Sequence, residues 1–233
     1  MLEHSLGEKY SKFVNVLIFI FPIVIISVKI GGDIVLFILA MMGILIAISQ
    51  KLSPFVIKEI KVFSYLTIGY FIAVCLSVFF SGQASELAHY IPRDFHFLFA
   101  PFIALALYKA EIDINYLIFG TKVALVVIGV IILDDFFLLG NSRPSGVMNA
   151  GVFGNLAVSL FFITLVFFKN ESFKNKVFST LSLSFGLLAI IASGTRGAWI
   201  SFVCLMGIYF YFYCKQKNKL SLRFKIIGVL IIS

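Results

Sequence analysis

The chain has 233 residues, of which 61% are hydrophobic and only 13% are charged, and phenylalanine alone occurs 28 times. Soluble domains are about half apolar and about a quarter charged, so this composition excludes a soluble domain and indicates an integral membrane protein. The net charge of +8 would suit a nucleic-acid partner. The cations are instead distributed as a membrane topology signal, described below, and nucleic acid is not expected.

The N-terminal segment "MLEHSLGEKYSKFVNVLIFIFPIVIISV" combines a cationic lead with an apolar run, as a secretory signal does. It has no small-x-small cleavage site and another apolar run follows at once, so we expect an uncleaved first span. The three cysteines, Cys75, Cys204 and Cys214, lie inside or at the ends of apolar runs and show no metal-ligand spacing. Neither a disulfide framework nor a bound metal is expected.

Apolar runs long enough to cross a bilayer, which takes about 20 residues, recur along the whole chain. They predict eight spans, near residues 13–30, 33–50, 62–80, 95–108, 116–139, 147–168, 177–192 and 198–214. A ninth run begins near Phe224 and stops at Ser233, so we expect the chain to be the N-terminal part of a longer protein. The predicted fold is all-α, a polytopic transmembrane helical bundle that forms one domain over residues 1–233.

The fourth span is the shortest, because "FLFAPFIALALY" is an uninterrupted apolar run of only twelve residues. If it crosses and the N-terminus lies inside, fifteen of the 19 lysines and arginines lie on the inner side. If it does not cross, the lysine clusters near residues 169 and 215 move outside, against the positive-inside rule. We therefore predict that it crosses, in a bacterial inner membrane with the N-terminus in the cytoplasm.

The few outer cations are mostly arginines. Arg93, Arg143 and Arg196 each precede a span that starts at the outer face. Lysine suffices for topology, whereas arginine grips phosphate or carboxylate with two parallel hydrogen bonds. A helix N-terminus is itself partly positive, so an added cation there is favourable when an anion binds between them. The pattern predicts an anion site at the outer face.

Structural roles for these arginines also remain open. Arg93 is followed by Asp94, which would give a local ion pair, and Arg143 has Asp134 and Asp135 on the same outer side. No carboxylate lies within twenty residues of Arg196 on either side. Arg196 is therefore the arginine whose position is hardest to explain by a local ion pair.

The stretch "SGTRGAWISF", residues 193–202, places Arg196 between small residues. Ser193 or Thr195 is expected to cap the following helix, and glycines on either side of Arg196 allow close approach of backbone or substrate. Trp199 lies one turn into the span, where interfacial aromatic anchors occur. Polar residues also lie near the start of the preceding outward-starting span, where each would need a partner, namely Asn149 and Asn155.

Two segments resemble a known family. "ASGTRGAWISFVCLMG" resembles the S-R-G-A-W segment of the O-antigen ligase and O-antigen polymerase family, although Thr195 stands where that family usually has serine. "RPSGVMNAGVFGNLAVSL" resembles the arginine-glycine segment that leads into the family's preceding outward-starting helix. The resemblance covers roughly residues 143–210.

The resemblance implies an inverting, metal-independent glycosyltransferase that uses no cofactor. Such an enzyme moves a glycan from undecaprenyl diphosphate to lipid A–core oligosaccharide, or to another lipid-linked repeat unit, at the periplasmic face. It implies that Arg196 is catalytic and that Arg143 binds the diphosphate. The family's general base is a histidine in a large outer loop after these spans, so the chain by itself is expected to be inactive.

The residues themselves add further candidates and alternatives. Arg93 is a third candidate for the diphosphate site, and His96, one turn later, is a candidate to orient a phosphate or the acceptor, or else an interfacial or capping histidine. A transporter or flippase of lipid-linked oligosaccharide is the main alternative function. It should place charge near the midplane of the bilayer and show paired halves with broken helices. A purely structural membrane subunit is a third possibility.

Overall fold

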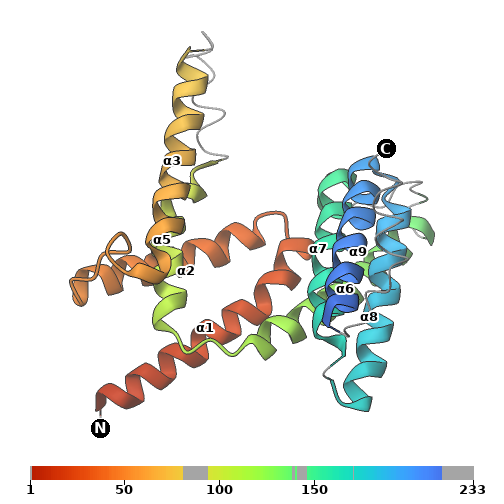
Figure 1. Ribbon diagram of the computed structural model, residues 1–233, viewed down its shortest axis with the longest axis horizontal. Coiled ribbons are helices and arrows are strands. Elements are labelled where there is room, and N and C mark those ends of the chain that lie inside the picture. Colours follow the sequence, from red (N-terminus) through yellow and green to blue (C-terminus); the bar gives the residue numbers. More distant parts are fainter. Residues whose placement is uncertain (1, 81–93, 138–139, 141–145, 170, 217–233) are drawn as a thin grey trace. The chain divides into compact units, whose positions relative to one another are not determined.

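The computed structural model describes residues 2–80, 94–137, 140, 146–169 and 171–216 (Figure 1). Within these ranges the protein is helical throughout, and no strand occurs. The helices are α1 (Leu2–Ser27), α2 (Gly31–Ser49), α3 (Lys58–Phe80), α5 (His96–Lys109), α6 (Ile114–Phe137), α7 (Ala150–Phe168), α8 (Phe173–Ala192) and α9 (Arg196–Gln216).

Seven of the described helices are long and apolar enough to cross a membrane, and each carries large hydrophobic side chains at its surface. At a rise of 1.5 Å per residue, a 20-residue helix matches a hydrocarbon core about 30 Å thick. The protein is therefore a polytopic helical membrane protein, as the composition predicts. The expected ninth span, from Phe224 onward, lies outside the described residues.

The chain divides into two compact units, Met1–Gly120 and Thr121–Ser233, which are described separately. In the first unit, α2 packs against both α1 and α5, and α3 packs against α5. Gly43 of α2 lies directly on the backbone of α5, because a Cβ at this position would overlap the carbonyl group of Phe102. Small residues that let helix backbones approach are typical of packing inside membranes.

The start of α1 contacts the last turn of α5 and the connection between α5 and α6. The Tyr10 hydroxyl donates a hydrogen bond to the carbonyl of Ala106 at 2.7 Å. The backbone N–H of Glu111 donates to Ser11 Oγ at 3.1 Å, and the Asn15 amide donates to the carbonyl of Glu111 at 3.2 Å. The contacts bring the start of α1 to the C-terminal end of α5. The helix α5 has 14 residues and extends about 21 Å, so it is shorter than a hydrocarbon core about 30 Å thick.

In the second unit, α7 packs against α8 and α9 (Figure 1). Its buried side includes Phe153, Ala157 and Val158, which are all less than 3% exposed. Farther along α7, Phe161 and Phe162 both contact the ring of Phe202 on α9, with ring centroids 5.5 and 5.7 Å apart. These contacts fix the register of α9 against α7 and thereby position the start of α9.

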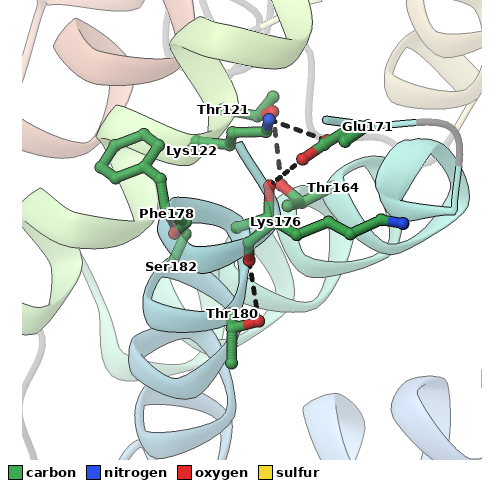
Figure 2. Close-up of polar contacts among 9 residues, drawn as sticks. Thr121, Lys122, Thr164, Glu171, Lys176, Phe178, Thr180 and Ser182 are labelled. Carbon is green, nitrogen blue, oxygen red and sulfur yellow. Dashed lines mark hydrogen bonds and ion pairs between the residues drawn. The ribbon is translucent and has the colours of Figure 1, made fainter. Parts of the chain in front are cut away.

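A buried ion pair joins α6 to the connection between α7 and α8. Lys122 Nζ lies 2.8 Å from Glu171 Oε1, and the two side chains are 6% and 10% exposed. Ser179 Oγ on α8 donates to Glu171 Oε2 at 2.6 Å. The Thr121 and Thr164 hydroxyls lie 3.4 Å apart beside this pair (Figure 2). Lys122, a cation within the apolar helix α6, is therefore neutralised by a neighbouring carboxylate.

Candidate functional site at the junction of α8 and α9

The segment Ser193–Thr195 turns the chain from α8 into α9 within three residues. The Ser193 N–H donates to the carbonyl of Ala189 and thereby ends α8. Gly194 has φ +60°, a left-handed conformation that glycine adopts without steric cost. The Trp199 N–H then donates to the carbonyl of Thr195 at 3.3 Å, which makes Thr195 the residue that precedes α9.

The two hydroxyls of this turn are engaged locally. Ser193 Oγ, which is fully buried, donates to the carbonyl of Ile190 at 3.0 Å and lies 3.2 Å from Thr195 Oγ1. Of the two residues expected to cap the helix, Ser193 thus ends α8 and Thr195 stands at the start of α9. The local bonds hold the turn in one conformation.

Gly154 of α7 lies directly against this turn. A Cβ at Gly154 would lie 2.6 Å from Ser193 Oγ, 2.8 Å from Thr195 Oγ1 and 3.0 Å from the Cβ of Ala198. A Cβ at Gly197 would have Asn155 Oδ1 as its nearest contact, at 3.9 Å. The two segments that resemble the ligase family are therefore packed together, although they lie about fifty residues apart in the sequence.

The contact with α7 decides which way Arg196 faces. Ala198 is fully buried at this contact, whereas Arg196, the first residue of α9, is exposed, and Trp199 is 44% exposed. Among the residues that the structure describes, no carboxylate forms an ion pair with Arg196. A guanidinium beside the free N–H groups of a helix start is a suitable site for a phosphate oxygen.

The lead-in to α7 is held by two hydrogen bonds from backbone N–H groups to side chains. Asn149 is the N-cap residue, and its Oδ1 accepts from the N–H of Gly151 at 2.7 Å. Asp135, which is buried near the end of α6, accepts from the N–H of Gly146 at 3.1 Å. Asn149 therefore has the partner that its position requires. Arg143, predicted to bind the diphosphate, lies outside the described residues.

His96 belongs to the first unit, at the start of α5. It is exposed and lines a pocket of about 480 Å³ together with Asp33 and aromatic side chains that include Phe37 and Phe99. Asp33 lies in the first turn of α2 and is not among the candidates predicted from the sequence. The sequence signal for it is a lone carboxylate at the start of an apolar span. Arg93 lies outside the described residues.

No protein-family model matches the chain. A Haemophilus influenzae protein named only as uncharacterized is 26% identical over 219 residues. The match covers 91% of this chain and 54% of the relative, so the chain spans about half the length of this curated relative. The similarity extends through both units of the chain.

Proposed function

We propose that the chain is part of an O-antigen ligase-like glycosyltransferase in the bacterial inner membrane, with its N-terminus in the cytoplasm. The enzyme transfers a glycan from undecaprenyl diphosphate to lipid A–core oligosaccharide or to another lipid-linked repeat unit at the periplasmic face. The observation that carries this proposal is the exposed side chain of Arg196 at the start of α9. The turn that precedes α9 is packed against Gly154 near the start of α7.

The proposed chemistry uses this guanidinium on the leaving group. As the bond between the anomeric carbon and the phosphate oxygen breaks, negative charge grows on the diphosphate. Parallel hydrogen bonds from Arg196 stabilise that charge, which is the largest help available from a preorganised cation. An acceptor hydroxyl attacks the anomeric carbon from the opposite side, so its configuration inverts. The hydroxyl proton passes to a general base that we assign to no residue of this chain.

His96 is proposed to orient the acceptor or a phosphate. Asp33 and His96 line the same pocket. A carboxylate beside a histidine commonly fixes the tautomer of its imidazole. Replacing His96 by alanine in the complete protein is expected to raise KM for the acceptor more than it lowers kcat. An unchanged KM in H96A would leave His96 without this role.

Transport of lipid-linked oligosaccharide is the second candidate. The observation in its favour is the buried Lys122–Glu171 pair, because ionisable groups inside membranes often mark transport paths. This candidate predicts that K122M/E171Q abolishes movement of a fluorescent lipid-linked sugar between leaflets of a vesicle. The transferase instead predicts that this double variant still forms product, since the pair touches neither Arg196 nor its turn.

The experiment that tests the proposed function is Arg196→Lys in the complete protein, given undecaprenyl-diphosphate-linked glycan and acceptor. Lysine keeps the charge and loses the two-pronged grip, so we expect transfer to fall on the order of 100-fold. The control is Thr195→Ser, which preserves the hydroxyl and introduces the residue typical of the family. Transfer by R196K at the rate of T195S would remove the need for a guanidinium and overturn the proposal.

A further inference from the structure

A groove of about 970 Å³ lies between the C-terminal halves of α7 and α9, far along both helices from Arg196. Its apolar wall includes Phe162 and Leu205, and its charged lining consists of Lys169 and Lys215. The groove lies entirely within the second unit. It plays no part in the proposed glycan transfer.

The length of the groove matches one leaflet of a bilayer. From Leu205 to Lys215 the axis of α9 advances about 15 Å, which is half of a hydrocarbon core about 30 Å thick. An apolar wall of this length matches the acyl-chain region of one leaflet, which would set the two lysines at headgroup depth. This end of the helices is the lysine-rich face, which we infer to be cytoplasmic.

The lysines are not neutralised within the groove. Lys169 Nζ lies 5.9 Å from the centroid of the Tyr213 ring, a cation–π contact that holds the ammonium at the groove. Glu171, the carboxylate nearest to Lys169 in the sequence, is engaged by Lys122 and Ser179. No carboxylate lines the groove among the residues that the structure describes. The groove thus has the charge that complements an anionic headgroup.

We propose that this groove binds an anionic phospholipid of the lysine-rich leaflet, with its phosphate between Lys169 and Lys215 and an acyl chain along Phe162 and Leu205. Basic pockets between transmembrane helices at the cytoplasmic side are suited to such headgroups. A partner helix would need carboxylates to match the two lysines, and a zwitterionic lipid would gain little from them. The bound lipid fills the space between α7 and α9 and thereby supports their packing.

The test uses the single tryptophan of the 233-residue chain. Trp199→Phe and Phe212→Trp move that probe from the start of α9 into the groove, and the protein is reconstituted with brominated phosphatidylglycerol or brominated phosphatidylethanolamine. We expect brominated phosphatidylglycerol to quench the probe at a mole fraction roughly thirtyfold lower, because each lysine contributes roughly fivefold. The K169Q/K215Q variant should lose this preference.

Two controls make the result specific. Lys174→Gln removes an exposed lysine in the first turn of α8 that does not line the groove, and K169R/K215R keeps both charges; both should retain the preference. Equal quenching by the two lipids, or a preference that survives K169Q/K215Q, would overturn the proposal. Quenching by neither lipid would also overturn it and show that protein covers the groove.

Discussion

Lys122 Nζ lies 2.8 Å from Glu171 Oε1, and both side chains are almost fully removed from the surface. The pair lies among apolar helices, where one isolated charge is expensive and a pair with further hydrogen bonds is tolerated. Ser179 satisfies the second oxygen of Glu171. Three elements, α6, the α7–α8 connection and α8, are therefore joined at one point.

Removing one charge of this pair should destabilise the protein more than removing both charges. Lys122→Met leaves the carboxylate of Glu171 buried and without its cation, and we expect the free energy of unfolding to fall by about 3–5 kcal/mol. The double variant K122M/E171Q removes both charges and should recover most of this loss. Unfolding of the purified protein in mixed micelles, titrated with dodecyl sulfate, measures the difference.

The exposed pair between Lys12 and Glu8 provides the matched control. Its atoms lie 2.6 Å apart, but the side chains are 72% and 59% exposed. Water screens such a pair, so Lys12→Met should leave unfolding unchanged within error. Two results would contradict this prediction. One is an unfolding free energy of K122M as high as that of K12M, and the other is a double variant that is as unstable as K122M. Either result would show that an unpaired buried charge at this site does not destabilise the protein.

The contact of Gly154 with the turn before α9 should tolerate no methyl group. In Gly154→Ala the new Cβ would fall 2.6 Å from Ser193 Oγ, and that hydroxyl is held by the carbonyl of Ile190. We expect α7 and the turn to separate, at a cost of about 1–3 kcal/mol in unfolding free energy. Glycan transfer by the complete protein should fall with it, since the start of α9 is displaced.

Gly207→Ala is the comparison for G154A. Gly207 lies within α9, and a Cβ there would have no neighbour within 4 Å. Alanine is the better helix former by up to about 1 kcal/mol, so G207A should keep or slightly raise stability. A G154A protein as stable as G207A would show that α7 does not approach the turn closely.

The left-handed conformation of Gly194 makes a separate prediction. A Cβ in this region costs about 1–2 kcal/mol, so Gly194→Ala should destabilise the protein by that amount, and Gly194→Asn should do so less. Gly197→Ala, three residues later, meets only Asn155 Oδ1 at 3.9 Å and should be neutral in stability. Thermal unfolding in detergent ranks the three variants, and a neutral G194A would exclude the left-handed turn.

Helix positions could be predicted from the sequence because lipid permits few other structures. A backbone inside a membrane must satisfy its own hydrogen bonds, so each apolar run becomes a helix. The bounds lie within a few residues of the predicted ones, except that α1 begins at Leu2 and not near residue 13. The charge distribution also predicts that the short α5 crosses the membrane, and this remains a prediction. Both predictions follow from one-dimensional patterns.

Tertiary contacts were not predictable in the same way. Lys122 finds its partner 49 residues later, in a connection rather than in a helix, and no spacing rule links the two. Nothing in the sequence marks Gly154, rather than another glycine, as the contact of Ser193. The convergence of arginines remains a prediction, since only Arg196 of the three lies within the described residues.

Cysteine labelling tests directly whether α5 crosses the membrane, because two positions lie on opposite sides in the two possible topologies. In a chain without its three native cysteines, Ile112→Cys labels the α5–α6 connection and Val147→Cys labels the approach to α7; both positions are more than 40% exposed. If α5 crosses, an impermeant maleimide reacts with V147C from the periplasm and with I112C only after the membrane is opened. If α5 does not cross, the two results are reversed.

Two further positions calibrate this labelling, because they precede α5 and do not depend on it. Ile30, between α1 and α2, should react from the periplasm as I30C, and Val56, between α2 and α3, should react as V56C only after the membrane is opened. With those two fixed, I112C that labels like I30C would place the end of α5 at the outer face. Arg196 would then lie at the cytoplasmic face, where a glycan on the periplasmic leaflet never meets it, and the proposed transfer would fail with the topology.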